Sequence, residues 1–272
     1  MYEPAAARPY FVPMSASLIP GAEPWSHVSA SPDAAGALVI HGFTGNPVSV
    51  RGLAEGFAAA GLHVEMPCLP GHGTTIDQML TTDWSHWAGE AEAAYQRLAG
   101  RARRIVVVGL SMGGSLTLRV AADHPEVAGL ICVNPATHPQ PAEVIAVLEG
   151  LLADGTTVIP GSGSDIADPD APASAYAGTP VAPLLSFMND GLAPLAHQYA
   201  SITSPLLLMT SPRDHVVAPA QSDYLAQQYG GPVERVSLDR SFHVATLDYD
   251  KELIVQRSVE FAGRVIAAAV AR

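Results

Sequence analysis

The ten residues VVVGLSMGGS, 106–115, join a β-branched apolar run to a serine that has a glycine two positions away on each side. The apolar run is typical of a buried strand, and the following SLTLRVAAD (115–123) is compatible with a helix. A sharp strand-to-helix turn would strain the backbone at Ser111 and expose its hydroxyl at the end of the strand, while Gly109 and Gly113 keep the neighbouring backbone clear. The stretch therefore predicts a serine nucleophile.

The alternative is an ordinary glycine-rich turn between a strand and a helix, as in nucleotide-binding folds. Such a turn would be expected to carry G-x-G-x-x-G, or a lysine placed to bind phosphate. The segment around Ser111 has neither, which favours the nucleophile.

Further short apolar runs alternate with segments of helical periodicity on both sides of this stretch. Several runs are apolar on both faces, as in parallel strands covered by helices on each side. The order strand, helix, strand, helix predicts right-handed crossovers and therefore an α/β domain with a mostly parallel central sheet and helices on both faces. The strand-like runs are 37–42, 62–68, 104–111, 129–135, 205–211 and 233–238.

Residues 138–203 break this alternation. They contain a predicted helix at 142–152, a Gly/Pro/Ser/Asp-rich stretch at 160–173 that favours an ordinary flexible loop, and an apolar segment without strand periodicity. We interpret 138–203 as an inserted cap or lid over the edge of the sheet. The core is then 36–137 and 204–272, preceded by an N-terminal extension, 1–35, that packs on it.

Composition limits the classes of protein to which the chain can belong. Its 272 residues are 48% hydrophobic and 15% charged, which excludes a disordered chain and allows one large core. The formal net charge of −12 argues against nucleic acid and anionic membrane surfaces as partners. No signal-peptide pattern or long apolar run occurs, so we expect a cytoplasmic protein without stable membrane insertion. The sequence leaves the oligomeric state open.

Cysteine and histidine spacing points to no cofactor. Two cysteines, Cys68 in a loop and Cys132 in an apolar run, are too few for a disulfide framework. The ten histidines show neither H-x-x-x-H nor C-x-x-C-type spacing, so no metal site is expected.

A serine hydroxyl needs a base to remove its proton and an acid to orient that base. His243 follows the last predicted strand, and Asp214 follows the preceding one. The order Ser111, Asp214, His243 is the one expected when these residues lie at successive strand ends of an α/β-hydrolase. The rival acids near His243 are Asp239, Asp248 and Asp250, for which a bond to the loop backbone is the simpler role.

The stretch HGFTG, 41–45, follows the first strong strand. Its glycines allow a turn that points the backbone N–H of Phe43 toward the site, beside that of Met112, so that the two amides form an oxyanion hole. A tight β-to-α turn without catalytic purpose is the alternative, and the presence of GLSMG in the same chain favours the oxyanion hole.

Taken together, HGFTGNP, LPGHGT, GLSMGG, DHVV and HVATLDYD resemble the α/β-hydrolase-fold carboxylesterases of the bacterial monoacylglycerol-lipase-like group, over most of 36–272. The resemblance implies a serine hydrolase that acts on carboxylic esters under a mobile lid. It assigns Ser111 as nucleophile, Asp214 and His243 as acid and base, and Phe43 and Met112 as oxyanion donors. One position departs from the family: an acidic residue that helps to hold glycerol is replaced by Ala177, which favours a more general esterase.

The expected substrate is a small ester with an apolar acyl chain. Leu184, Leu185, Met188 and Val216 are the candidates for the acyl pocket, although an aliphatic stripe is as often plain packing. The same triad would also serve a thioesterase, an acyltransferase or a carbon–carbon bond hydrolase. A non-catalytic ligand-binding protein of this fold would be expected to have lost a triad residue, and none is missing here.

Overall fold

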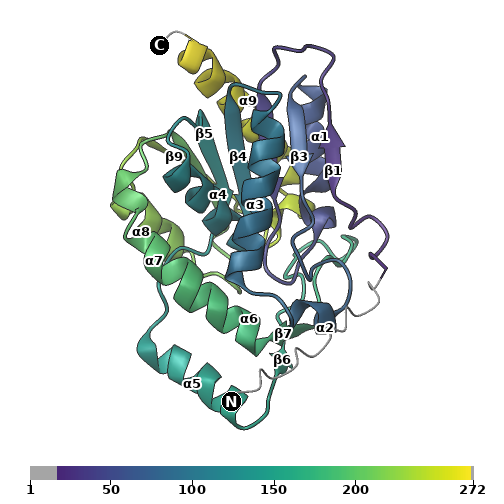
Figure 1. Cartoon of the computed structure of the whole chain (residues 1–272), viewed down its shortest axis with the longest axis vertical. Coiled ribbons are helices and arrows are strands. Elements are labelled where there is room, and N and C mark those ends of the chain that lie inside the picture. Colours follow the sequence, from purple (N-terminus) through teal and green to yellow (C-terminus); the bar gives the residue numbers. More distant parts are fainter. Residues whose placement is uncertain (1–16, 271–272) are drawn as a thin grey trace, which may run out of the picture.

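A seven-stranded sheet forms the centre of the computed structural model, which describes residues 17–270 (Figure 1). Its strand order is β1-β3-β2-β4-β5-β8-β9; β1 is antiparallel to β3, and every other neighbouring pair is parallel. The strands are β1 (Trp25–His27), β2 (Gly36–Ile40), β3 (His63–Met66), β4 (Ile105–Leu110), β5 (Gly129–Val133), β8 (Leu206–Thr210) and β9 (Val233–Ser237).

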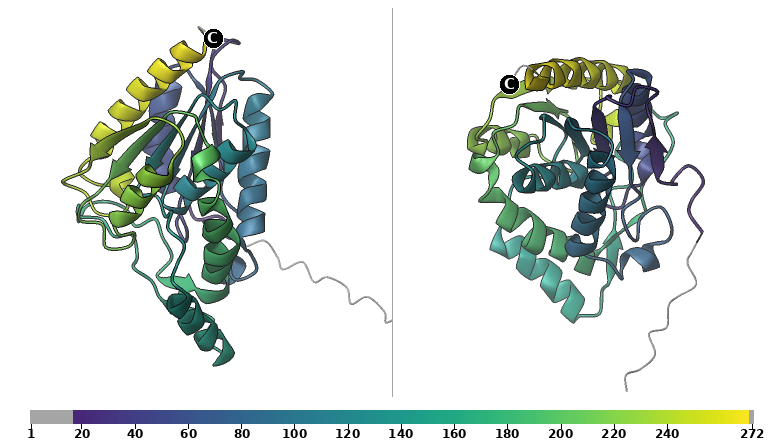
Figure 2. Two further views of the ribbon diagram at one scale, coloured as in Figure 1. Left: turned by 90° about the vertical axis from the view of Figure 1, so that its left-hand side faces the viewer. Right: turned by 45° about the horizontal axis from the view of Figure 1, so that its top comes forward.

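Helices cover both faces of the sheet, as the sequence predicts. The left view of Figure 2 shows the sheet between α9 on one side and α3 and α4 on the other. The helices of the core are α1 (Arg51–Ala59), the short α2 (Ile76–Met79), α3 (Trp84–Ala99), α4 (Met112–Asp123), α8 (Ala220–Gln228) and α9 (Lys251–Val270).

Successive residues of each strand enter two different apolar cores, because side chains alternate between the faces of a sheet. In β4, Val107 packs with α3 and α4, whereas Val106 and Val108 pack with α1 and α9. All three valines are fully buried, which explains why the strands read as continuous apolar runs.

Local signals at the helix starts agree with the sequence. Asn46 accepts a hydrogen bond from the Val48 amide at 3.0 Å, and the chain then makes one 3-10 turn (Pro47–Val50) before α1. Asp83 caps α3 by accepting from the His86 amide at 3.2 Å.

Three short strands are absent from the prediction. β1 lies in the N-terminal extension and adds an antiparallel edge to β3, while the pair β6 (Val158–Pro160) and β7 (Gly178–Pro180) forms a small separate sheet. Each strand has three residues, too few to show a period of two. Residues 1–16 of the predicted N-terminal extension lie outside the described residues.

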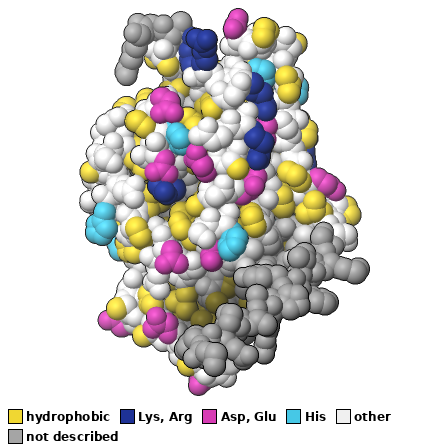
Figure 3. All heavy atoms as spheres, viewed as in Figure 1, with side chains coloured by type: hydrophobic (Ala, Val, Ile, Leu, Met, Phe, Trp, Pro, Cys, Tyr) yellow, Lys and Arg dark blue, Asp and Glu magenta, His cyan; other side chains and the backbone are white. Residues whose placement is uncertain are grey.

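Residues 138–203, called the cap segment below, leave the sheet after β5 and return to it before β8. They contain α5 (Ala142–Ala153), α6 (Val181–Ser186), a π-helical stretch (Phe187–Leu192) and α7 (Ala193–Ala196). Figure 1 places these helices below the sheet, and Figure 3 shows apolar side chains gathered at this end of the molecule. No helix within residues 17–270 combines the length and apolar character needed to cross a bilayer.

Candidate active site

Ser111 occupies a strained turn between β4 and α4. Its φ of 57° and ψ of −120° lie in a region that a residue with a side chain rarely adopts, and its amide donates to the Val133 carbonyl at 3.0 Å. The turn closes only because two glycines flank it. A Cβ on Gly109 would lie 2.0 Å from the Gly113 carbonyl oxygen, and one on Gly113 would lie 2.2 Å from the Ile40 carbonyl oxygen.

The loop after β2 runs directly against this serine. A Cβ on Gly42 would lie 3.1 Å from Ser111 Cβ and 3.7 Å from its Oγ, so glycine allows the close approach. Within residues 17–270, the amides of Phe43 and Met112 donate to no protein acceptor. Met112 is also the first residue of α4, where an N–H has no partner inside the helix.

His41 fixes the peptide unit that carries the Phe43 amide. Its Nδ1–H donates to the Gly42 carbonyl oxygen at 3.0 Å, and its Nε2 accepts from the Leu69 amide at 3.0 Å. That carbonyl belongs to the same planar peptide as the Phe43 N–H, so the histidine orients both groups. Burial lowers the pKa of His41 to about 4, against the opposing effect of the bond to Gly42, and the ring is therefore neutral at pH 7.

An aromatic cluster packs around Phe43 in the same loop. The Phe43 ring centroid lies 5.6 Å from that of Trp87, 6.2 Å from that of Phe187 and 6.4 Å from that of His72. Burial lowers the pKa of His72 to about 3, and repulsion from His41 in its protonated form adds to this effect. His72 is thus a neutral packing residue within this cluster.

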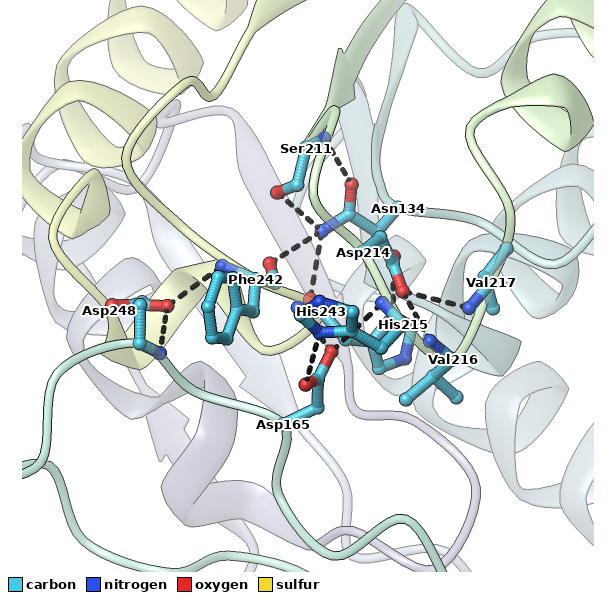
Figure 4. A network of polar contacts seen from close by, with 11 residues as sticks. Asn134, Asp165, Ser211, Asp214, His215, Val216, Val217, Phe242, His243 and Asp248 are labelled. Atoms are coloured by element: carbon cyan, nitrogen blue, oxygen red, sulfur yellow. Dashed lines mark hydrogen bonds and ion pairs between the residues drawn. The ribbon is translucent and has the colours of Figure 1, made fainter.

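Figure 4 shows the loops after β8 and β9, which bring Asp214 and His243 together. His243 Nδ1 lies 2.7 Å from Asp214 Oδ2, and both side chains are buried, 9% and 1% exposed respectively. Asp214 Oδ1 accepts from the amides of Val216 and Val217, each at 2.8 Å. A carboxylate in this position accepts the Nδ1–H of a neutral imidazole and leaves Nε2 as a free base.

Asn134, at the end of β5, links the loops that carry this pair. Its amide nitrogen donates to the His243 carbonyl at 2.8 Å and to the Ser211 hydroxyl at 3.0 Å, and its Oδ1 accepts from the Ser211 amide at 2.7 Å. Its φ of 44° is left-handed, a conformation that asparagine tolerates better than most residues.

Each of the rival acids bonds its own loop, as expected, and Asp248 also bonds two amides of the cap segment. Asp250 accepts from the Ser241 hydroxyl at 2.9 Å, Asp248 accepts from the Phe242 amide at 2.9 Å, and Asp239 bonds the hydroxyl of a neighbouring serine. None of the three carboxylates bonds the His243 ring.

A cavity of about 330 Å³ opens between the sheet and the cap segment, and both Ser111 and His243 line it. No hydrogen bond joins these two described side chains, and such bonds are commonly long before substrate binds. Of the predicted acyl-pocket residues, Leu184, Met188 and Val216 line the cavity. Leu185 does not line it, and is buried with Leu148 and Val181 in an apolar cluster of the cap segment.

The walls of this cavity carry no lysine, arginine, aspartate or glutamate among the described residues. Nor do residues 17–270 contain a group of three or more His, Cys, Asp and Glu side chains that could hold a metal ion. Both cysteines are free.

Comparison with known proteins identifies the family. The model of the family described as serine aminopeptidase, S33, matches residues 31–250, most of the chain. The chain belongs to this family. Members share the α/β-hydrolase architecture described above, and the fold predicted from the sequence is confirmed.

Two curated bacterial proteins are similar to this chain in sequence. A thermostable monoacylglycerol lipase of Bacillus sp. strain H-257 is 39% identical over 247 residues, covering 90% of this chain and 95% of the relative. A carboxylesterase of Bacillus subtilis strain 168 is 24% identical, covering 82% and 90% of the two chains.

Comparison with solved structures gives the same family of enzymes and the same fold. One of the metagenome-derived lipolytic enzymes LipS and LipT has a TM-score of 0.85 at 39% identity and covers 91% of this chain and all of its own. Paleococcus ferrophilus monoacylglycerol lipase, at 17% identity and a TM-score of 0.71 over 89% and 99% of the two chains, shares the fold. The resemblance to the monoacylglycerol-lipase-like group is confirmed, and the chain is a serine hydrolase of the esterase and lipase class.

Three residues near the site carry no assigned role in the sequence interpretation. His41 lies inside the quoted HGFTG motif, yet only geometry reveals its bond to the Gly42 carbonyl, in the peptide that carries the Phe43 amide. Asn134 follows a buried strand, a position at which polar residues often serve a site. Asp165 lies in the Gly/Pro/Ser/Asp-rich stretch, where composition predicts only a flexible loop and gives no signal of its contacts.

Proposed function

We propose that this protein hydrolyses neutral carboxylic esters through an acyl-enzyme formed on Ser111. The observation that carries the proposal is the buried 2.7 Å contact between His243 Nδ1 and Asp214, in a site where His243 and Ser111 line one cavity. This arrangement supports His243 as the base for Ser111, with Asp214 holding the productive tautomer.

In the first step, His243 Nε2 takes the proton of the Ser111 hydroxyl as Oγ attacks the ester carbonyl. The imidazolium then gives this proton to the departing alcohol. In the second step, His243 Nε2 removes a proton from water as the water oxygen attacks the acyl carbon. The bond from the acyl carbon to Oγ then breaks, the imidazolium returns the proton to Oγ, and the acid is released. Asp214 stabilises the imidazolium in both steps.

Negative charge on the tetrahedral oxygen would be held by the amides of Phe43 and Met112. Support comes from their lack of other acceptors within residues 17–270, from the place of Met112 at a helix N-terminus, and from the His41 contact to the peptide of Phe43. Loss of one such donor typically lowers kcat by about 10²–10³.

The cavity supports a neutral substrate of limited size. Charged side chains are absent from its walls among the described residues, and Leu184, Met188 and Ile159 contribute apolar surface for an acyl chain. Its volume of about 330 Å³ lies near the lower end of the range of roughly 300–1,000 Å³ for small-molecule pockets, which favours short and medium chains. Without a cation in the walls, the phosphates of an acyl-coenzyme A thioester have no partner there, so we place oxygen esters first.

Glycerol esters are one group within this class. The relative from Bacillus sp. strain H-257 is a monoacylglycerol lipase by its name. Here Ala177 occupies the position at which the resemblance implies an acidic glycerol-binding residue, and we therefore propose that selectivity for glycerol over simple alcohols is weak.

The test uses p-nitrophenyl esters and monoacylglycerols of graded chain length with wild type, Ser111→Ala and, as a control, the exposed-surface variant Ser201→Ala. We expect Ser111→Ala to lose turnover and labelling by a fluorophosphonate probe, and Ser201→Ala to retain both. Turnover of Ser111→Ala at the wild-type rate would contradict the proposal. Labelling of Ser111 without turnover of any ester would favour the acyltransferase alternative.

A further inference from the structure

Asp165 of the cap segment contacts both loops that carry the acid–base pair (Figure 4). Its Oδ2 accepts from the backbone amides of His243 and His215, each at 3.1 Å, and its Oδ1 lies 2.9 Å from His215 Nδ1. Its own carbonyl oxygen accepts from the Val244 amide at 3.2 Å. One cap residue therefore bonds the main chain of the base and of the residue that follows Asp214.

A second carboxylate fastens the same stretch of cap from the opposite side. Asp248, fully buried, accepts from the cap amides of Ala167 at 2.8 Å and Asp168 at 3.0 Å, and from the Phe242 amide at 2.9 Å. Residues 165–168 and the loop that carries His243 are thus held as one unit. The flexible loop that composition predicts is, at these residues, tied to the site.

The backbone at Asp165 argues that its carboxylate is needed. Its φ of 36° lies in the left-handed region, which favours glycine, and Gly163, two residues earlier, adopts a φ of 64°. Glycine would relieve the strain at 165, whereas aspartate retains it. Strained residues of this kind persist where the surrounding contacts hold them, often beside functional sites.

We propose that Asp165 is a positioning residue for the reaction: its carboxylate sets the separation of the loops bearing Asp214 and His243, so the cap contributes to the acid–base pair as well as to the acyl pocket. This inference rests on the proposed function. It predicts that removing the carboxylate moves His243 relative to Asp214 and slows the chemical steps without weakening substrate binding. A displacement of about 1 Å at a catalytic group can cost on the order of 10² in rate.

Three variants separate hydrogen-bond geometry from charge and from backbone strain. Asp165→Asn can keep its carbonyl oxygen at the Oδ2 position, where both main-chain amides converge. It loses the charge and places an NH₂ where Oδ1 faces His215 Nδ1. Asp165→Ala removes the acceptor. Asp165→Gly also removes it but relieves the left-handed strain, so it remains informative if Asp165→Ala does not fold. Asp170→Ala, an exposed cap aspartate with no contact to either loop, is the matched control.

The variants are compared by kcat and KM with a short p-nitrophenyl ester, by thermal melting, and by the far-downfield proton resonance of the His243–Asp214 hydrogen bond. For Asp165→Gly and Asp165→Ala we expect kcat to fall by roughly 10²-fold with KM nearly unchanged, and the resonance to shift or broaden. Asp165→Asn and Asp170→Ala should stay close to wild type in all three.

Wild-type kcat and resonance in folded Asp165→Gly would overturn the inference, even if the melting temperature fell, because that pattern indicates a structural role only. An Asp165→Asn variant as impaired as Asp165→Gly would also overturn it, since the amide acceptor would then be insufficient. Failure of the proposed function appears differently, as wild-type turnover by Ser111→Ala.

Discussion

Asp214→Asn replaces one carboxylate oxygen by an NH₂ group and so tests the proposed role of Asp214 as the partner of His243. Asp214 Oδ1 accepts the amides of Val216 and Val217, and Oδ2 faces His243 Nδ1. An asparagine has one oxygen for these two positions. With the oxygen toward the two amides, its NH₂ donates to Nδ1, so the Nε2 of His243 carries the proton and cannot act as a base.

The structure decides between the two orientations of that asparagine. Turning the NH₂ toward Val216 and Val217 would leave both amides without an acceptor, and for the buried Val217 this costs about 1–3 kcal/mol. The orientation that blocks His243 is therefore favoured by about 1 kcal/mol or more. In serine proteases, loss of the productive tautomer by the same substitution lowers kcat by about 10⁴, close to 5 kcal/mol of transition-state stabilisation.

The assay is the steady-state rate with a p-nitrophenyl ester at pH 7, beside the control Asp239→Asn. Asp239 is exposed, lies close to His243 in the sequence and does not contact its ring. We expect Asp214→Asn to lose about four orders of magnitude in kcat and Asp239→Asn to match wild type. A folded Asp214→Asn enzyme within about tenfold of the wild-type kcat would refute the assignment of the pair.

Three other predictions follow from the same geometry. Gly113→Ala should destabilise the fold by about 3 kcal/mol or more, measured by urea unfolding, because its Cβ would lie 2.2 Å from the Ile40 carbonyl oxygen; a change below about 1 kcal/mol would contradict the tight turn. Burial lowers the pKa of His41 to about 4 and of His72 to about 3, below the ordinary value of 6.5. Between pH 6.5 and these values the unfolded chain binds more protons than the folded one, so the free energy of unfolding declines as the pH falls through this window. The free energy of unfolding should then drop by up to about 1.4 kcal/mol per pH unit for each histidine, and His72→Phe should reduce that slope; an unchanged slope would contradict the buried neutral ring. Leu184→Trp should raise KM for longer acyl chains more than for acetate esters, because Leu184 lines the cavity; equal effects on all chain lengths would place the acyl chain elsewhere.

The parallel sheet was predictable because its strands are buried on both faces. Continuous buried runs such as Ile105–Leu110, separated by segments of helical periodicity, admit few other arrangements. The edge strand β1 and the β6–β7 pair escaped prediction because three half-exposed residues carry little pattern.

The candidate site, like the fold, was only partly predictable from the sequence. Ser111, Asp214 and His243 were predicted from their places at strand ends, and His243 Nδ1 lies 2.7 Å from Asp214 Oδ2, as that prediction requires. Leu185 was grouped with Leu184 because both are apolar and adjacent, yet neighbouring helical residues point in different directions, and only Leu184 lines the cavity.

The sequence alone was therefore enough to predict the chemistry and its order along the chain: a serine between glycines after a buried strand, with an acid and a histidine after later strands. Those signals are local, since turn geometry and apolar periodicity depend on neighbours in sequence. The folded chain was needed to show that Asp214 is the carboxylate that meets His243, that His41 bonds the peptide of Phe43, and that Asp165 bonds the loops of His215 and His243. Each of these contacts depends on the orientation of a side chain or on the meeting of two loops in the folded chain. No pattern of neighbouring residues in the sequence predicts either.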